Sequence, residues 1–79
     1  MQKGELLVTG QGSIDIDLNA APAETRAHFK DDESIVIVPC NPQHIDDLEF
    51  EVRLVNGTYH LHLTWSVSSS RVILWEASY

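Results

Sequence analysis

Cysteine is nearly absent from this 79-residue sequence, and the single Cys40 excludes an intrachain disulfide. Basic residues are also scarce, with five Lys and Arg against twelve Asp and Glu and a net charge of −7. Nucleic-acid phosphates and anionic membrane surfaces attract clustered Lys and Arg. We therefore expect no direct contact with nucleic acid and none with membranes.

Long apolar runs are missing as well. No segment approaches the roughly 18 apolar residues that a membrane-spanning helix needs. The chain does not open with the basic segment and apolar stretch of a signal peptide, so we expect no secretion by that route. One cysteine agrees with a reducing compartment.

What the sequence does contain is an ordinary apolar fraction of 43%, enough for one folded domain over residues 1–79. A domain of this size buries only about 60% of the surface that its unfolded chain exposes. Small domains usually gain further stability from disulfides, metals or oligomerisation. With no disulfide available, we expect a homo-oligomer.

The stretch from Leu48 to Ala77 predicts three consecutive antiparallel strands, a C-terminal meander. Asn56-Gly57 lies between two alternating runs, which is a strong hairpin signal because a type I′ turn needs positive φ at both central residues. Val55 is predicted to pair with Thr58 beside the turn. The predicted apolar pairs are Leu54 with Tyr59, Val52 with Leu61, Phe50 with Leu63, and Leu48 with Trp65. The predicted polar pairs are Arg53 with His60, Glu51 with His62, and Glu49 with Thr64.

A three-residue loop at Ser68–Ser70 keeps the next strand in phase with the same core face. This loop places Ile73 opposite Trp65, Trp75 opposite Leu63, and Ala77 opposite Leu61. Glu76 then lies beside His62 on the polar face.

Four shorter strands are predicted before the meander, at Glu5–Thr9, Ser13–Leu18, Thr25–Lys30 and Ser34–Val38. Met1–Gly4 is expected to be a loose start and Pro39–His44 a long loop. For Thr25–Lys30 the sequence allows two predictions, a strand or a short helix that begins near Pro22. Together with the meander, these strands predict an all-β fold, a small antiparallel sandwich or barrel of about seven short strands.

A polar cluster of Glu51, His60, His62 and Glu76 is expected on the outer face of the meander. Two imidazoles and two carboxylates can bind Zn²⁺. Their spacing is not a zinc signature, and exposed cross-strand ion pairs explain them better. Cys40 with His44 lacks an orienting third group for nucleophilic catalysis. We therefore expect no catalytic, metal or cofactor site.

Three apolar side chains are predicted on the outer face, namely Val55, Val72 and Leu74. Exposed apolar side chains that gather on one surface are typical of a contact between proteins. Together with the small size of the domain, they predict a subunit interface.

Four runs in the C-terminal half are informative together, namely Val38–Pro42, Asp47–Val52, Leu63–Val67 and Arg71–Trp75. In these runs the chain resembles small all-β proteins of tailed bacteriophages and prophages. The resemblance implies a virion component, such as a capsid-decorating, head–tail or tail module, assembled in the host cytoplasm and in contact with another virion protein.

The function expected from the sequence is therefore a non-enzymatic structural or interaction module. The alternative is an acidic inhibitor that mimics nucleic acid and occupies the basic groove of a host protein. A mimic needs carboxylates in rows near phosphate spacing, which alternate residues of a strand approximate. Asp15 with Asp17, and Glu49 with Glu51, meet this condition, but Arg53 and the histidines interrupt the rows.

Overall fold

The computed structural model describes residues 1–31, 36–38, 43–45 and 47–79, and within them it contains strands and no helices. Six strands have six to nine residues: β1 (Gln2–Val8), β2 (Gln11–Leu18), β3 (Glu24–Phe29), β6 (Leu48–Val55), β7 (Thr58–Ser66) and β8 (Arg71–Ser78). Two more have three residues each: β4 (Val36–Val38) and β5 (Gln43–Ile45).

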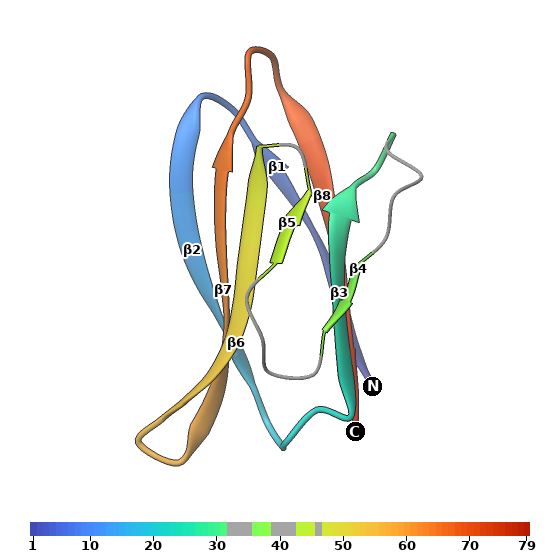
Figure 1. The fold of residues 1–79 in the computed structure, drawn as a ribbon, viewed down its shortest axis with the longest axis vertical. Coiled ribbons are helices and arrows are strands. Elements are labelled where there is room, and N and C mark those ends of the chain that lie inside the picture. Colours follow the sequence, from blue (N-terminus) through green and yellow to red (C-terminus); the bar gives the residue numbers. More distant parts are fainter. Residues whose placement is uncertain (32–35, 39–42, 46) are drawn as a thin grey trace.

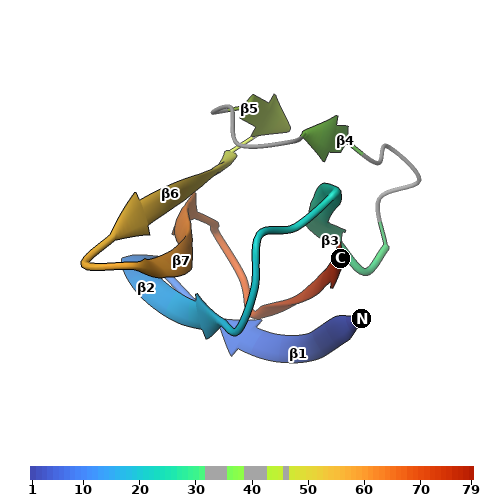
Figure 2. The ribbon, with the colours of Figure 1, turned by 90° about the horizontal axis from the view of Figure 1, so that it is seen from below.

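The strands form two antiparallel sheets that face each other as a sandwich (Figures 1 and 2). Sheet A has the order β1-β8-β3-β4, and sheet B has the order β2-β7-β6-β5. The all-β prediction is confirmed, but the predicted count of about seven short strands is not, since six strands are longer and two have only three residues each. Of the two predicted architectures the sandwich is the one observed, with two separate sheets.

The predicted hairpin register is confirmed over its whole length. Every pair from Val55↔Thr58 to Leu48↔Trp65 is present between β6 and β7. The turn has positive φ at both central residues, 50° at Asn56 and 80° at Gly57. This turn lies at the lower end of the sandwich in Figure 1.

The predicted meander is wrong beyond β7. β8 does not pair with β7 but lies in the opposite sheet, between β1 and β3. Trp75 is opposite Gly4 and Ala27, and Ile73 is opposite Leu6 and Phe29. The alternation of β8 correctly identified its inner face, but the inner faces of both sheets meet at the same core, so alternation does not identify the neighbouring strand.

Two connections carry the chain from one sheet to the other at the same end of the sandwich, the upper end in Figure 1. One joins β1 to β2 and the other joins β7 to β8. The Val67 N–H donates to the Gly10 carbonyl at 2.8 Å, which ties the two connections together. Trp65 Nε1–H also reaches the Thr9 carbonyl at 3.4 Å.

The core consists of apolar side chains from the facing surfaces of the two sheets. Sheet A contributes Val8, Ala27, Phe29, Ile73 and Ala77, and sheet B contributes Leu18, Leu48, Phe50, Val52, Leu61 and Leu63. Trp65 and Trp75 pack against this core, each over a glycine of the adjacent edge strand, Gly12 and Gly4.

The strand bounds bear on three further expectations. Thr25–Lys30 is a strand in all but its last residue, because β3 spans Glu24–Phe29. The loose start is wrong, since β1 begins at Gln2 and pairs along its length with β8. The loop expected at Pro39–His44 is wrong for Gln43 and His44, which belong to the short β5, and its residues 39–42 lie outside the described part of the chain.

The hairpin turn yields a stability prediction. Gly57→Val should lower the free energy of unfolding by about 1 kcal/mol or more, because a β-branched residue resists positive φ. No atom within 4 Å would meet an added Cβ, so backbone strain alone is tested. Asn56→Gly is the matched control and should change stability little. Denaturant unfolding measures both, and an unchanged Gly57→Val midpoint would contradict the turn geometry.

Candidate functional site

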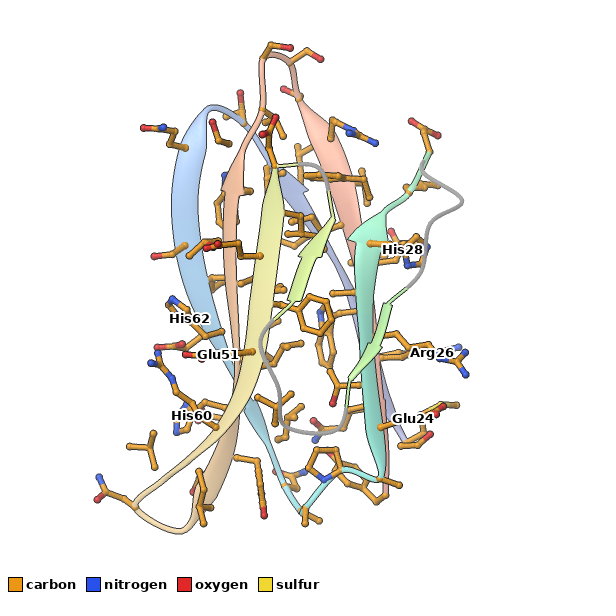
Figure 3. The ribbon with its side chains drawn as sticks, viewed as in Figure 1. Glu24, Arg26, His28, Glu51, His60 and His62 are labelled. Carbon is orange, nitrogen blue, oxygen red and sulfur yellow. The ribbon has the colours of Figure 1, made fainter. Side chains whose placement is uncertain are left out.

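The outer face of sheet B carries polar side chains in rows that cross three strands. One row joins Asp15 on β2, His62 on β7 and Glu51 on β6. The next row joins Asp17, His60 and Arg53. We call these two rows the polar rows. Figure 3 shows Glu51, His60 and His62 together on this side of the molecule.

Ion pairs connect the members of the polar rows. His62 Nδ1–H donates to Asp15 Oδ1 at 2.5 Å, and His60 Nδ1 lies 2.9 Å from Asp17 Oδ1. Arg53 bridges the rows, 3.2 Å from Glu51 and 3.5 Å from Asp15. All of these groups are partly or fully accessible to water, which screens such pairs and leaves them a small contribution to stability.

Glu76 does not belong to this cluster, which corrects the sequence-based prediction. It lies in sheet A, where Arg26 Nη1 is 3.0 Å from Glu76 Oε1. Arg26 Nη2 is 2.9 Å from Glu24 Oε1, so Arg26 pairs with both carboxylates. Figure 3 shows Arg26 and Glu24 on the side of the molecule away from His62. The strand crossing after β7 separates the predicted members, and Asp15 of β2 takes the place beside His62.

Asp15 is the member of the polar rows that sequence reasoning missed. Its alternation with Asp17 placed both on an outer face, but nothing local indicated that β2 would pair with β7. The hydrogen bond from His62 is the main reason that the pKa of Asp15 is lowered. Desolvation opposes this shift, and the charges of His62 and Arg53 add to it.

The described residues contain no group of three or more His, Cys, Asp or Glu arranged to hold a metal ion. Cys40 lies outside the described residues, and so do the side-chain contacts of His44. In the part of the chain that the structure covers, no helix has the length and apolar character to cross a membrane.

Apolar side chains gather on the outer face of sheet A. Leu7 of β1 is opposite Val72 of β8, and Leu74 follows two residues along β8 on the same face. Leu7 is 71% exposed, whereas Val72 and Leu74 are half-buried. We call Leu7, Val72 and Leu74 the outer apolar patch.

Val55 is not part of the outer apolar patch. It is 41% exposed and ends β6, beside the hairpin turn of sheet B. Val72 is near the opposite end of the sandwich, because β8 begins at the upper connection (Figure 1). The three predicted interface residues therefore do not form one strip, and Leu7 joins Val72 and Leu74 instead.

A surface hollow of about 140 Å³ adjoins the outer apolar patch at Leu74. Its other lining residues are Arg26, His28, Trp75 and Glu76. The hollow combines an apolar wall with the Arg26–Glu76 ion pair. This part of sheet A is therefore concave as well as partly apolar.

No protein-family model, no curated protein and no solved structure matches this chain. The resemblance to tailed-phage proteins therefore stays a prediction.

The polar rows yield a pH prediction. Because the folded-state pKa of Asp15 is lowered, its contribution to stability is present above the unfolded pKa and is lost as pH falls through the folded pKa. His62→Gln should raise the Asp15 pKa toward its ordinary value, as followed by NMR of its carboxyl carbon. His60→Gln is the control, since His60 bonds Asp17, and it should leave Asp15 unchanged. Equal shifts in the two variants would contradict the assignment to His62.

Proposed function

We propose that this protein is a non-enzymatic interaction module, a subunit of a homo-oligomer that contacts its neighbours through the outer face of sheet A. The observation that carries the proposal is the outer apolar patch, because Leu7, Val72 and Leu74 adjoin one another on an otherwise solvent-facing surface. Adjoining exposed apolar side chains are typical of protein interfaces.

The charges of the two outer faces favour sheet A for contact between identical copies. Sheet B carries four carboxylates, on Asp15, Asp17, Glu49 and Glu51, with Arg53 as its only permanent cation within the described residues. Two such faces would repel each other. On sheet A, Arg26 and Lys3 offset much of the charge of Glu5, Glu24 and Glu76, so identical copies can approach.

A virion role follows from the resemblance to tailed-phage proteins and is part of the proposal. In a shell or tail the outer apolar patch would contact another copy or a second virion protein. The acidic outer face of sheet B would then face solvent or a basic partner.

The alternative function, an acidic mimic of nucleic acid, receives less support from the ion pairs. A mimic presents free carboxylates to a basic groove, whereas Asp15, Asp17 and Glu51 are each within ion-pair distance of a His or an Arg of the same face. We therefore keep the oligomeric module as the proposed function.

Leu74→Asp tests the proposal. The native chain should sediment as an oligomer at micromolar concentration, and the variant should associate at least about tenfold more weakly, because a buried carboxylate is costly at an interface. Circular dichroism should show the native strand content, since Leu74 lies outside the core.

Val55→Asp is the matched control, since it adds the same charge to an exposed apolar position of the other sheet. Val55→Asp should leave the oligomer mass measured by sedimentation unchanged. A native monomer at micromolar concentration, or equal loss of association in both variants, would show the proposal to be wrong.

A further inference from the structure

β1 is a long edge strand whose second side has no partner among the described strands. It is the first strand in the order of sheet A, and β8 occupies only one of its sides. Below its connection to β2, β1 diverges from that strand toward the end labelled N (Figures 1 and 2). A free edge presents unpaired backbone N–H and C=O groups, which another strand can bind.

The outward side chains of this edge carry opposite charges two residues apart. Lys3 and Glu5 are both exposed on the outer face, and neither has an ion-pair partner within the described residues. By contrast, the nearby Arg26 binds both Glu24 and Glu76. Met1 and Leu7, on either side of this charged pair, are 75% and 71% exposed.

From this pattern we infer that β1 pairs with β1 of a second copy, antiparallel, about a twofold axis between the two Gly4 residues. This register places Lys3 opposite Glu5 of the second copy and Met1 opposite Leu7 of the second copy, each contact occurring twice. Side chains alternate along a strand, so only every second register keeps the outer faces of both copies on one side.

The neighbouring registers lack this complementarity. An axis through Lys3 would place Lys3 opposite itself, and an axis through Glu5 would place Glu5 opposite itself. Like charges directly opposite each other destabilise a strand pair. The register centred on Gly4 is the one that joins opposite charges. Gly4 also has no Cβ, and the indole of Trp75 lies over it, so the second copy would cover that indole at the edge.

The other long edge strand does not share these features. β2 borders sheet B and carries Asp15 and Asp17 on its outer side. Two copies of β2 would bring acidic residues together without any basic residue of that strand. β4 and β5, at the remaining edges, have only three residues each.

The inference rests on the proposed function, because it describes a second contact within the same homo-oligomer. Pairing through β1 would join two copies of sheet A into one eight-stranded sheet. Both outer apolar patches would lie on the same face of that sheet, where they could bind a further pair of copies.

Charge reversal in the full chain tests the register. Lys3→Glu and Glu5→Lys should each raise the dissociation constant of the β1 contact by roughly tenfold or more, because each variant places like charges opposite each other. The double variant restores opposite charges at the native net charge of −7 and should associate nearly as the native chain does. An equimolar mixture of the two single variants should form mixed dimers.

General charge repulsion predicts a different result. Glu5→Lys makes the acidic chain less negative, so repulsion alone would strengthen association, whereas the β1 contact predicts weakening. Asp17→Lys is the matched control, with the same charge change on the other long edge strand, and it should not weaken association. Analytical ultracentrifugation measures all of these variants, and circular dichroism verifies their folding.

The outcomes separate this inference from the proposed function. If the native chain associates, Leu74→Asp weakens it and the reversals do not, then the β1 contact is wrong and the proposed function stands. Failure of the double variant to recover would also overturn the register. If the native chain is a monomer throughout, both ideas are wrong.

Discussion

The two tied connections at one end of the sandwich are the constraint on which the rest of the structure depends. The hydrogen bond from Val67 to Gly10 holds together the β1–β2 and β7–β8 connections, two of the segments that carry the chain between sheets. Because both segments cross, β1 pairs with β8 in one sheet while β2 pairs with β7 in the other. The apolar sides of all four strands then face one core, which includes Val8, Leu18, Leu63 and Ile73.

This crossing also divides the surface into two faces of different chemistry. Sheet B receives the strands whose outer sides are rich in Asp, Glu and His, and their side chains pair with one another. Sheet A receives the outward leucines and valine, together with charges that nearly balance. Like-charge repulsion opposes contact between two acidic faces, so the proposed self-association is favoured at the outer face of sheet A over that of sheet B.

Alternation along each strand and the chemistry of one turn were readable from the sequence. Asn56-Gly57 set the register of the hairpin, and the inward positions of Ile73 and Ala77 were predicted correctly. The neighbours of β8 were not predictable in the same way, because Trp75 can pack into one core from either sheet. That ambiguity misplaced Glu76 beside His62 and grouped Val55 with Leu74, and it hid the pairing of Asp15 with His62.

Methyl NMR on dilution from millimolar concentration to below the dissociation constant of the oligomer, as located by sedimentation, tests the central claim most directly. If copies meet through the outer face of sheet A, the methyl signals of Leu7, Val72 and Leu74 should shift with concentration. The signals of Val55, exposed on the other sheet, should stay constant. Concentration-dependent shifts at Val55 with none at Leu74, or no shifts at all, would contradict the account.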